Sequence, residues 1–491
     1  MDRRDADVIV VGAGLTGLTA AFDLVQRGLQ VEVLEAAPRA GGVIATHRRD
    51  VPGGTVLFET GPNSGMDTTP RINALLDQLG IRGQRVDAQR AAACRYVLRG
   101  GRILPVPASP LGMLTTSLFS WRARVGLLRE PFVRARDIPA GEQSIAAFAR
   151  RHLGQELLDY AVEPFVGGVY AGDPERLSIE AAFPSLASLE RRYGSLLRGA
   201  LLSARTRRRA AAESGERAKT RATSFNFAGG MQTLVDALAQ RLPRLACGAR
   251  VEAIRRDADA LYVVEVERDG TRSSRRAPAL LLALPAFEAA RLVAALGDAA
   301  AAAADALAAI HYPPVAVVSA AYHRKDVAHR LDGFGFLAPR VEDPPVLGTL
   351  FTSSMFAGRA PDDVAVLTSF VGGRRNPQAA LAAEEHIAAD VVRSNAYLLG
   401  AGAPMFSEVQ RWPRAIPQYD LGHLQRVAAV AALEAQMPGL ALCGNWRDGV
   451  SVADCIKAGT QRSAQVAAML GCERAADAAS SEERGQPLAA G

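Results

Sequence analysis

The feature that most constrains this chain is a strand, a glycine-rich turn and a helix that follow one another at its start. Residues 8–11 are a continuous apolar run, which is typical of a parallel strand buried on both faces. The turn at residues 12–17 has the spacing G-x-G-x-x-G. Residues 15–26 then carry apolar side chains at helical spacing, and a second apolar run ends just before Glu35. This order predicts a βαβ unit that binds the pyrophosphate of a dinucleotide.

Each glycine of the turn has a physical role. Gly12 permits the tight turn, Gly14 leaves space for a phosphate, and Gly17 lets the helix lie close to the strand. The helix N-terminus adds unpaired N–H groups and the positive end of its dipole, while Glu35 can accept hydrogen bonds from ribose hydroxyls. A glycine turn without a ligand is the alternative interpretation. The residues expected to bind the cofactor here are Gly12, Ala13, Gly14, Leu15, Thr16, Gly17 and Glu35.

A second glycine pair, Gly41-Gly42, follows shortly after Arg39. Such a pair lets the chain cross beside the pyrophosphate, as FAD-binding folds do, so we assign Arg39 and Gly42 to the same site. The sequence shows no second strand–GxGxxG–helix unit that would bind NAD(P)H. We therefore expect FAD, reduced by a substrate rather than by a nicotinamide. The five cysteines form no C-x-x-C pair, which argues against a disulfide reductase and against a zinc site.

The chain has 491 residues, more than one hydrophobic core accommodates. Its helix and strand patterns predict an α/β (mixed α+β) fold with a Rossmann-like FAD-binding domain, a mixed-sheet substrate domain and a helical insertion. The expected boundaries are a discontinuous FAD-binding domain at 1–90, 222–300 and 405–472, a helical insertion at 91–203, a mobile basic loop at 204–221, a substrate-binding sheet domain at 301–404 and a disordered tail at 473–491.

The net charge of +6 suits an anionic substrate or an anionic membrane surface, and equally an arginine-rich proteome. The first residues lead directly into a strand without the pattern of a signal peptide, and no apolar run reaches the roughly 18 residues of a membrane span. We therefore expect a cytoplasmic protein with no nucleic-acid partner. Residues 114–121, beside Arg122 and Arg124, would suit peripheral contact with a membrane, although a buried helix is the commoner explanation.

Further motifs stand at intervals along the chain. They are ETGPNS at 59–64, GVYAGD at 168–173, GFGFL at 333–337, IPQY at 416–419 and GNWRDGVSVADC at 444–455. With these motifs the chain resembles the protoporphyrinogen/coproporphyrinogen oxidase family, within the flavin amine oxidase superfamily, over residues 1–472. Amine oxidases and carotenoid desaturases share the glycine-rich start, but they are not expected to share GPNS or IPQY in these places.

The resemblance implies further contacts with FAD. Residues 61–64 would run beneath the flavin ring, Val251 would meet the adenine through its backbone, and Asn445 with residues 450–452 would bring the last helix to the pyrimidine end of the ring. No cysteine stands where amine oxidases attach their flavin, so we expect noncovalent binding. The implied cofactor residues are Val43, Gly61, Pro62, Asn63, Ser64, Val251, Trp412, Asn445, Val450, Ser451 and Val452.

The resemblance also implies a substrate site. Arg95 would pair with a propionate, while Phe334 and Leu337 would sandwich a tetrapyrrole and Phe370 would add another apolar wall. Gly168 belongs to the same expected set. The alternatives are a solvated surface arginine and ordinary core packing of the apolar side chains.

The reaction implied by the resemblance is the FAD-dependent oxidation of protoporphyrinogen IX to protoporphyrin IX in heme biosynthesis. It would proceed by three two-electron hydride transfers to the flavin, with oxygen as the acceptor, so we assign no catalytic side chain and no metal ligand. The alternatives are coproporphyrinogen III oxidation to coproporphyrin III, a flavin amine oxidase or desaturase with another substrate, and an FAD-binding scaffold without turnover. A quinone acceptor and a homodimer are left open.

Overall fold

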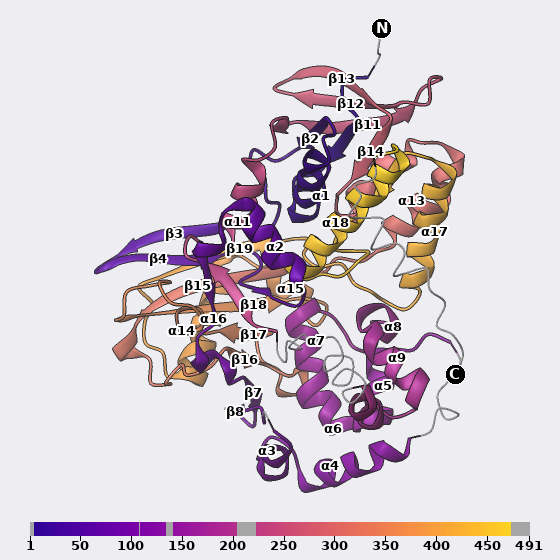
Figure 1. Cartoon of the computed structure of the whole chain (residues 1–491). Helices are drawn as coiled ribbons and strands as arrows, with labels where there is room; N and C mark the ends of the chain where they lie inside the picture. Colours follow the sequence, from indigo (N-terminus) through magenta and orange to yellow (C-terminus); the bar gives the residue numbers. More distant parts are fainter. Residues whose placement is uncertain (1–3, 108, 134–140, 204–221, 473–491) are drawn as a thin grey trace.

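The computed structural model describes residues 4–107, 109–133, 141–203 and 222–472. The loop expected at 204–221 and the tail expected at 473–491 lie outside the described residues. The described residues together form two large sheets, smaller strand units and a group of helices (Figure 1).

The first sheet has five parallel strands in the order β10-β2-β1-β14-β20. Their bounds are β1 Val8–Val11, β2 Val31–Glu35, β10 Leu245–Cys247, β14 Ala279–Leu282 and β20 Leu440–Leu442. Val8 and Val10 point into the apolar core on one face, while Ile9 and Val11 point into the core on the other. Because both faces are covered, every residue of β1 is apolar, as the sequence predicts.

Helices cover both faces of this sheet, and Figure 1 shows α1 and α18 side by side on one of them. On that face lie α1 Leu15–Gln26, α2 Pro70–Leu79, α11 Gln232–Ala239 and α18 Val452–Met469. The other face carries α12 Ala286–Ala294, α13 Ala301–Ala308, α17 His423–Gln436 and the antiparallel sheet of β11 Arg250–Arg256, β12 Tyr262–Arg268 and β13 Thr271–Ala277.

The second sheet has seven strands in the order β19-β15-β18-β17-β16-β7-β8, antiparallel except for the pair β16 and β7. The bounds are β7 Tyr96–Arg99, β8 Arg102–Pro105, β15 Val315–His323, β16 Gly335–Leu337, β17 Gly348–Leu350, β18 Val364–Gly372 and β19 Phe406–Trp412. Against it pack α14 Thr352–Met355, α15 Pro377–Leu381 and α16 Glu384–Leu399.

Three strands of this sheet lie outside the segment 301–404 that the sequence assigns to it. β7 and β8 fall in the stretch expected to be helical, and β19 falls in the stretch expected to join the cofactor domain. Gly100 and Gly101, both at positive φ, form the two-residue turn of the β7–β8 hairpin. The hairpin is drawn into the sheet by pairing with β16, a partner far away in the sequence.

Helices dominate the remainder of residues 110–193 and gather at the lower end of the molecule in Figure 1. They are α3 Pro110–Thr115, α4 Trp121–Gly126, η3 Leu127–Phe132, α5 Ile145–Leu153, α6 Gln155–Leu157, the π-helical turn η5 Leu158–Val162, α7 Glu163–Tyr170, α8 Ile179–Ala182 and α9 Pro184–Tyr193. No helix in the described ranges is long and apolar enough to cross a bilayer.

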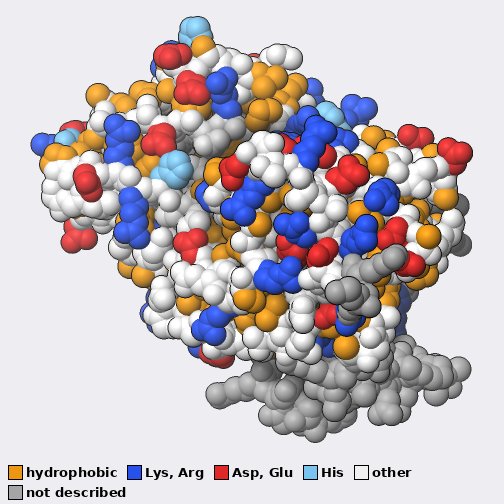
Figure 2. All heavy atoms as spheres, turned by 90° about the horizontal axis from the view of Figure 1, so that it is seen from above, with side chains coloured by type: hydrophobic (Ala, Val, Ile, Leu, Met, Phe, Trp, Pro, Cys, Tyr) orange, Lys and Arg blue, Asp and Glu red, His pale blue; other side chains and the backbone are white. Residues whose placement is uncertain are grey.

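Two small antiparallel units complete the fold. One is the hairpin of β3 Thr46–Val51 and β4 Gly54–Glu59, and the other joins β5 Gly65–Met66, β9 Ser224–Phe227 and β6 Arg85–Asp87. On the face shown in Figure 2, basic and acidic side chains are interspersed. The positive excess of the chain is therefore not gathered into one patch on that face.

Candidate active site

The glycines in the turn between β1 and α1 are of two kinds, those required by packing within the chain and one that faces open space. A Cβ on Gly12 would lie 2.4 Å from the Ala283 carbonyl oxygen, and one on Gly17 would lie 2.0 Å from the Gly12 carbonyl oxygen. Both positions therefore require glycine for packing alone. Gly14 has an ordinary φ of −68°, and a Cβ there would meet no atom within 4 Å. The open side of Gly14 is where a ligand can approach the backbone.

Glu35 ends β2 beside this turn. Its Oε2 accepts the Ala13 N–H at 2.7 Å and its Oε1 accepts the Ala37 N–H at 2.8 Å. Each carboxylate oxygen keeps a second lone pair that can accept from a ribose hydroxyl. The Ala249 N–H donates to the Glu35 carbonyl at 2.8 Å, which brings the start of β11 and Val251 to the same end of the sheet.

The second glycine pair lies against the first turn. The Gly41 N–H donates to the Ala13 carbonyl at 2.8 Å, and a Cβ on Gly42 would lie 3.4 Å from the Gly14 Cα. The Arg39 guanidinium braces this loop by donating to its carbonyls, those of Ala40, Gly42 and Ile44, at 2.9–3.0 Å. Arg39 therefore acts on the site through the shape of its own loop.

A cavity of about 420 Å³ opens next to Val43. Its size is within the range of about 300–1,000 Å³ found for small-molecule sites. It brings together expected residues from both sets: Val43, Gly61, Pro62, Asn63, Ser64, Trp412, Asn445 and Val450 from the cofactor set, and Gly168, Phe334, Leu337 and Phe370 from the substrate set. Residues 12–17 with Glu35, Arg39 and Gly42 lie outside it, at the glycine turns. Arg95, Val251, Ser451 and Val452 also do not line the cavity, and they lie on other elements.

One wall of the cavity is the segment 60–64. A Cβ on Gly61 would lie 2.0 Å from the Val43 carbonyl oxygen, so this segment fits directly against the second glycine loop. The Trp412 indole N–H donates to the Thr60 carbonyl at 2.7 Å. Asn63 is buried, and its Oδ1 has no hydrogen-bond partner among the described residues. A buried acceptor without a partner on a cavity wall fits the polar edge of a bound ring.

A buried polar cluster supports this wall from behind. Glu59 and Arg359 are 1% and 2% exposed, and Arg359 Nη1 lies 3.3 Å from Glu59 Oε1. Asn226 Nδ2 donates to Glu59 at 3.2 Å and to the Asn63 carbonyl at 2.8 Å. Burial raises the pKa of Glu59, while hydrogen bonds from Thr46 and the Met231 N–H, and then the Arg359 charge, act in the opposite direction.

Another part of the cavity wall is the segment that leads to α18. Asn445 and Val450 line the cavity, and Ser451 is the N-cap of the helix. Ser451 and Asp454 form a capping box, which uses the N–H groups of both residues. The positive end of this helix therefore begins directly after the lining residue Val450, with part of its charge offset by Asp454.

The remaining walls are apolar. Val315 and Val317 on β15 face the cavity, while their neighbours Ala316 and Val318 face the core of the second sheet. No Asp, Glu, His, Lys or Arg is among the described residues that line the cavity. Further lining residues that the sequence analysis did not assign are Thr60, Met66, Gly167, Val169, Ala171, Phe336, Leu347, Gly348, Thr349, Leu350, Ala415 and Ile416. Because residues 315–318 are all apolar and buried, no alternation in the sequence distinguishes the face of this wall.

Arg95 lies outside the cavity, next to one of its lining residues. Its side chain is exposed, and its guanidinium carbon lies 5.3 Å from the centroid of the Phe334 ring. Arg95 makes no ion pair with a residue that the structure describes. Its cationic group is therefore held by a cation–π contact near the cavity, with its hydrogen-bond donors available.

Comparison with known proteins assigns the family. The chain matches the flavin containing amine oxidoreductase family over residues 15–467. The chain belongs to this family. It is 32% identical over 479 residues to protoporphyrinogen oxidase 2, chloroplastic/mitochondrial, of Arabidopsis thaliana, with 92% of each chain covered. It is 31% identical over 493 residues to coproporphyrinogen III oxidase of Propionibacterium freudenreichii, covering 93% of this chain and 89% of the relative. The resemblance drawn from the motifs is thereby confirmed, and the protein is a flavin-dependent oxidoreductase.

Solved structures confirm the fold class. A protein of Exiguobacterium sp. 255-15, provisionally assigned as a protoporphyrinogen oxidase, superposes with a TM-score of 0.78 at 22% identity and covers 96% of this chain and 100% of its own. Reduced UDP-galactopyranose mutase superposes with a TM-score of 0.71 at 17% identity, with 98% of each chain covered. At these identities the likeness concerns the architecture alone.

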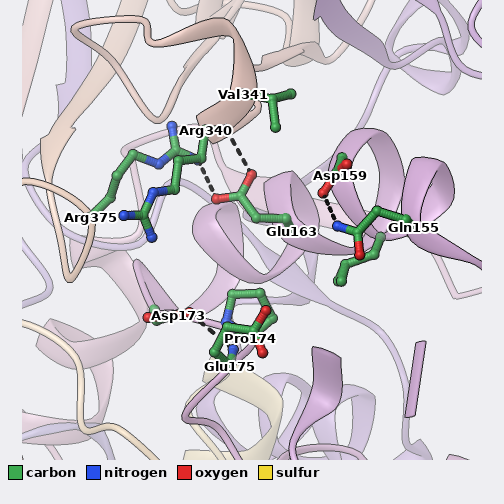
Figure 3. A pocket seen from close by; sticks show the side chains of 11 residues that line it. Gln155, Asp159, Glu163, Asp173, Pro174, Glu175, Arg340, Val341 and Arg375 are labelled. Carbon is green, nitrogen blue, oxygen red and sulfur yellow. Dashed lines mark hydrogen bonds and ion pairs between the residues drawn. The ribbon is translucent and has the colours of Figure 1, made fainter. Parts of the chain in front are cut away.

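A second, smaller cavity of about 110 Å³ in this flavoenzyme is bordered by α7 (Figure 3). Glu163 at the start of α7 pairs with Arg375 at 2.5 Å and accepts the Arg340 N–H at 2.9 Å. Arg375 also donates to the Ala338 carbonyl at 2.8 Å. The pair thus fixes α7 to the segment that follows β16. This contact matters for the large cavity because its lining residues Gly168 and Leu337 lie on α7 and at the end of β16.

Glu163→Ala is expected to raise the KM for the substrate of the large cavity several-fold, because an unpaired Arg375 loosens the wall between α7 and β16. One partner of a nearly buried pair is costly to remove, so the melting temperature should fall by several degrees. Glu175→Ala is the matched control, since Glu175 borders the same small cavity but pairs with Arg150 at the surface. Steady-state kinetics on flavin-loaded protein measures both variants, and equal KM values for Glu163→Ala and the wild type would contradict this role.

Proposed function

We propose that this flavoenzyme is a protoporphyrinogen oxidase that binds FAD noncovalently and oxidises protoporphyrinogen IX to protoporphyrin IX. The oxidation comprises three two-electron hydride transfers, with oxygen as the final acceptor. When bound, FAD supplies the hydride acceptor for the methylene bridges of the macrocycle. The observation that carries the proposal is the uncharged, largely apolar cavity with the cationic Arg95 beside it.

The charge of the cavity favours one porphyrinogen over the other. Protoporphyrinogen IX has its two propionates on adjacent pyrroles, so both can stay near the entrance while the apolar half enters. Coproporphyrinogen III has four propionates around the ring, so its entry would bring carboxylates against walls that offer no cation among the described residues. Burying an unpaired carboxylate costs several kcal/mol. The similarity to a coproporphyrinogen III oxidase makes that substrate the second candidate.

The side chains of the cavity position the reactants rather than move protons. Val315, Val317 and Phe370 exclude water from the space next to the residues 61–64. Trp412 holds the Thr60 carbonyl, and so fixes the start of that segment. Since no titratable side chain lines the cavity among the described residues, its contribution is the placement of the donor carbon about 3–3.5 Å from the acceptor.

The proposal is tested by giving both porphyrinogens to the flavin-loaded enzyme in parallel, with oxygen uptake and porphyrin fluorescence as readouts. We expect a kcat/KM for protoporphyrinogen IX at least about tenfold above that for coproporphyrinogen III, the ratio for one unfavourable contact of about 1.4 kcal/mol. The opposite preference would establish the second candidate. If neither porphyrinogen reduces the bound flavin under anaerobic conditions, the proposed reaction is wrong.

Arg95→Ala is expected to lower kcat/KM for protoporphyrinogen IX by about thirtyfold, because a propionate loses a bidentate partner worth about 2 kcal/mol. Arg95→Lys should recover only part of the loss, since an ammonium lacks the planar fork and stacks less well on Phe334. Arg102→Ala is the matched control, an exposed arginine on β8 of the same hairpin. Flavin content should be unchanged in all three variants. Wild-type kinetics in Arg95→Ala would mean that the propionate is bound elsewhere.

A further inference from the structure

The motif at residues 416–419 connects the two halves of the cavity. Ile416 lines the cavity, and Gln418 Nε2 donates to the Tyr170 carbonyl at 2.8 Å. Tyr170 ends α7, the helix that carries Gly168. The next residue, Tyr419, is buried and turns toward the segment 445–449, which leads from β20 to α18. One short segment therefore contacts both the substrate wall and the cofactor end.

The Tyr419 hydroxyl bridges the two ends of the segment 445–449. It donates to the Asn445 carbonyl at 2.6 Å and accepts the Gly449 N–H at 2.9 Å. Asn445 lines the cavity directly, and Gly449 precedes the lining residue Val450. The hydroxyl thus fixes the separation of two backbone groups that flank the cavity.

Other anchors hold the middle of this segment on the side of the first sheet. Trp446 is fully buried, and its indole N–H donates to the Leu284 carbonyl at 3.1 Å. Arg447 forms a bidentate ion pair with Glu434 of α17, in which both hydrogen bonds are 2.8 Å long. Neither residue borders the cavity. The contacts of Tyr419 are therefore distinct, because they act on the residues next to the cavity.

The surroundings of Tyr419 keep its hydroxyl protonated. Its ring stacks on His423, with centroids 4.3 Å apart and an interplanar angle of 13°. Burial lowers the pKa of His423 to about 4, so this imidazole is neutral at pH 7. Burial, followed by the nearby Tyr170, raises the pKa of Tyr419 well above its ordinary value. The phenol therefore remains a donor to the Asn445 carbonyl throughout the physiological range.

We propose that Tyr419 is a positioning residue for the cofactor: its hydroxyl holds the segment 445–449 in the conformation that binds the FAD ring. This role rests on the proposed cofactor. Without the hydroxyl, a partly buried carbonyl and a partly buried N–H lose their partner, and the segment gains freedom where Asn445 and Val450 face the cavity.

The test compares Tyr419→Phe with Tyr262→Phe. Tyr262 is a matched control because it is also fully buried, and its hydroxyl donates to the carbonyls of Met437 and Pro438 at 3.1 and 3.0 Å, away from the cavity. Apoprotein of each variant is titrated with FAD, and the visible circular dichroism of the bound flavin is recorded. We expect Tyr419→Phe to weaken FAD binding about tenfold and to change the dichroism, whereas Tyr262→Phe lowers the melting temperature without either effect.

Two results would overturn the role of Tyr419. One is a wild-type FAD affinity together with unchanged dichroism in Tyr419→Phe, and the other is an equal loss of affinity in Tyr262→Phe, which would indicate general destabilisation. The proposed reaction fails separately, since a wild type that binds FAD without oxidising a porphyrinogen leaves the comparison of affinities intact. A wild type that binds no FAD would overturn both the cofactor and this role.

Discussion

Gly14→Val is expected to give a folded protein that has lost its flavin. A Cβ at Gly14 meets no atom of the chain within 4 Å, and its backbone lies in a region that valine tolerates, so the fold has no reason to change. The side chain would instead occupy the space of the pyrophosphate. Flavin absorbance per protein after purification measures the loss, and the melting temperature is compared with that of wild-type apoprotein.

Two further glycines serve as controls for Gly14. Gly83→Val also enters open space, but in an exposed turn away from the site, and it should retain full flavin. Gly17→Val should fail to fold, because its Cβ would lie 2.0 Å from the Gly12 carbonyl oxygen. Full flavin occupancy in Gly14→Val would show that the phosphates bind elsewhere.

Arg359→Met should give a folded protein with a large loss of stability. It leaves the Glu59 carboxylate buried without its cation, and breaking such a pair costs about 3–5 kcal/mol. In a protein of this size that corresponds to a fall in melting temperature of about 3–5 °C. Flavin retention should also decrease, because Asn226 links Glu59 to the Asn63 carbonyl on the cavity wall.

The double variant Glu59→Gln/Arg359→Met separates charge from shape. With both charges removed, the Gln amide can still form hydrogen bonds with Thr46 and the Met231 N–H. We therefore expect the double variant to have a higher melting temperature than Arg359→Met alone. The measurement is thermal unfolding of the wild type, Arg359→Met and the double variant. A double variant less stable than Arg359→Met alone would mean that the ion pair itself is not the stabilising element.

The sequence was most informative where structure follows from neighbouring residues. The strand at 8–11 and the helix at 15–26 agree with β1 and α1, because a doubly buried strand and a glycine turn each leave a local pattern. The motif at 61–64 and the residues Asn445 and Val450 likewise meet at one cavity. Their distances from one another along the chain show that motifs of a resembling family convey tertiary proximity that periodicity does not.

The features of the fold and the site that the sequence did not predict depend on contacts between residues that are remote in sequence. Nothing local indicates that the hairpin of β7 and β8 pairs with β16, or that β19 lies beside β15. The residues 315–323 fall within the sheet domain expected at 301–404, yet the face that Val315 and Val317 turn to the cavity is defined by other elements. The two hydrogen bonds of the Tyr419 hydroxyl could not be predicted from the sequence either. Its partners are backbone groups, which every residue type has.

The order of the first sheet has a consequence for synthesis on the ribosome. β1 lies between β2 and β14, β20 follows at the edge, and α18 covers α1 with Gly459 against the Thr16 carbonyl. The glycine turn is thus translated before β14, β20 and the helix that covers it. A nascent chain must hold apolar strands without their neighbours until α18 has emerged, which exposes it to aggregation. Flavin uptake therefore follows the synthesis of α18, and truncation before residue 452 should yield colourless, poorly folded protein.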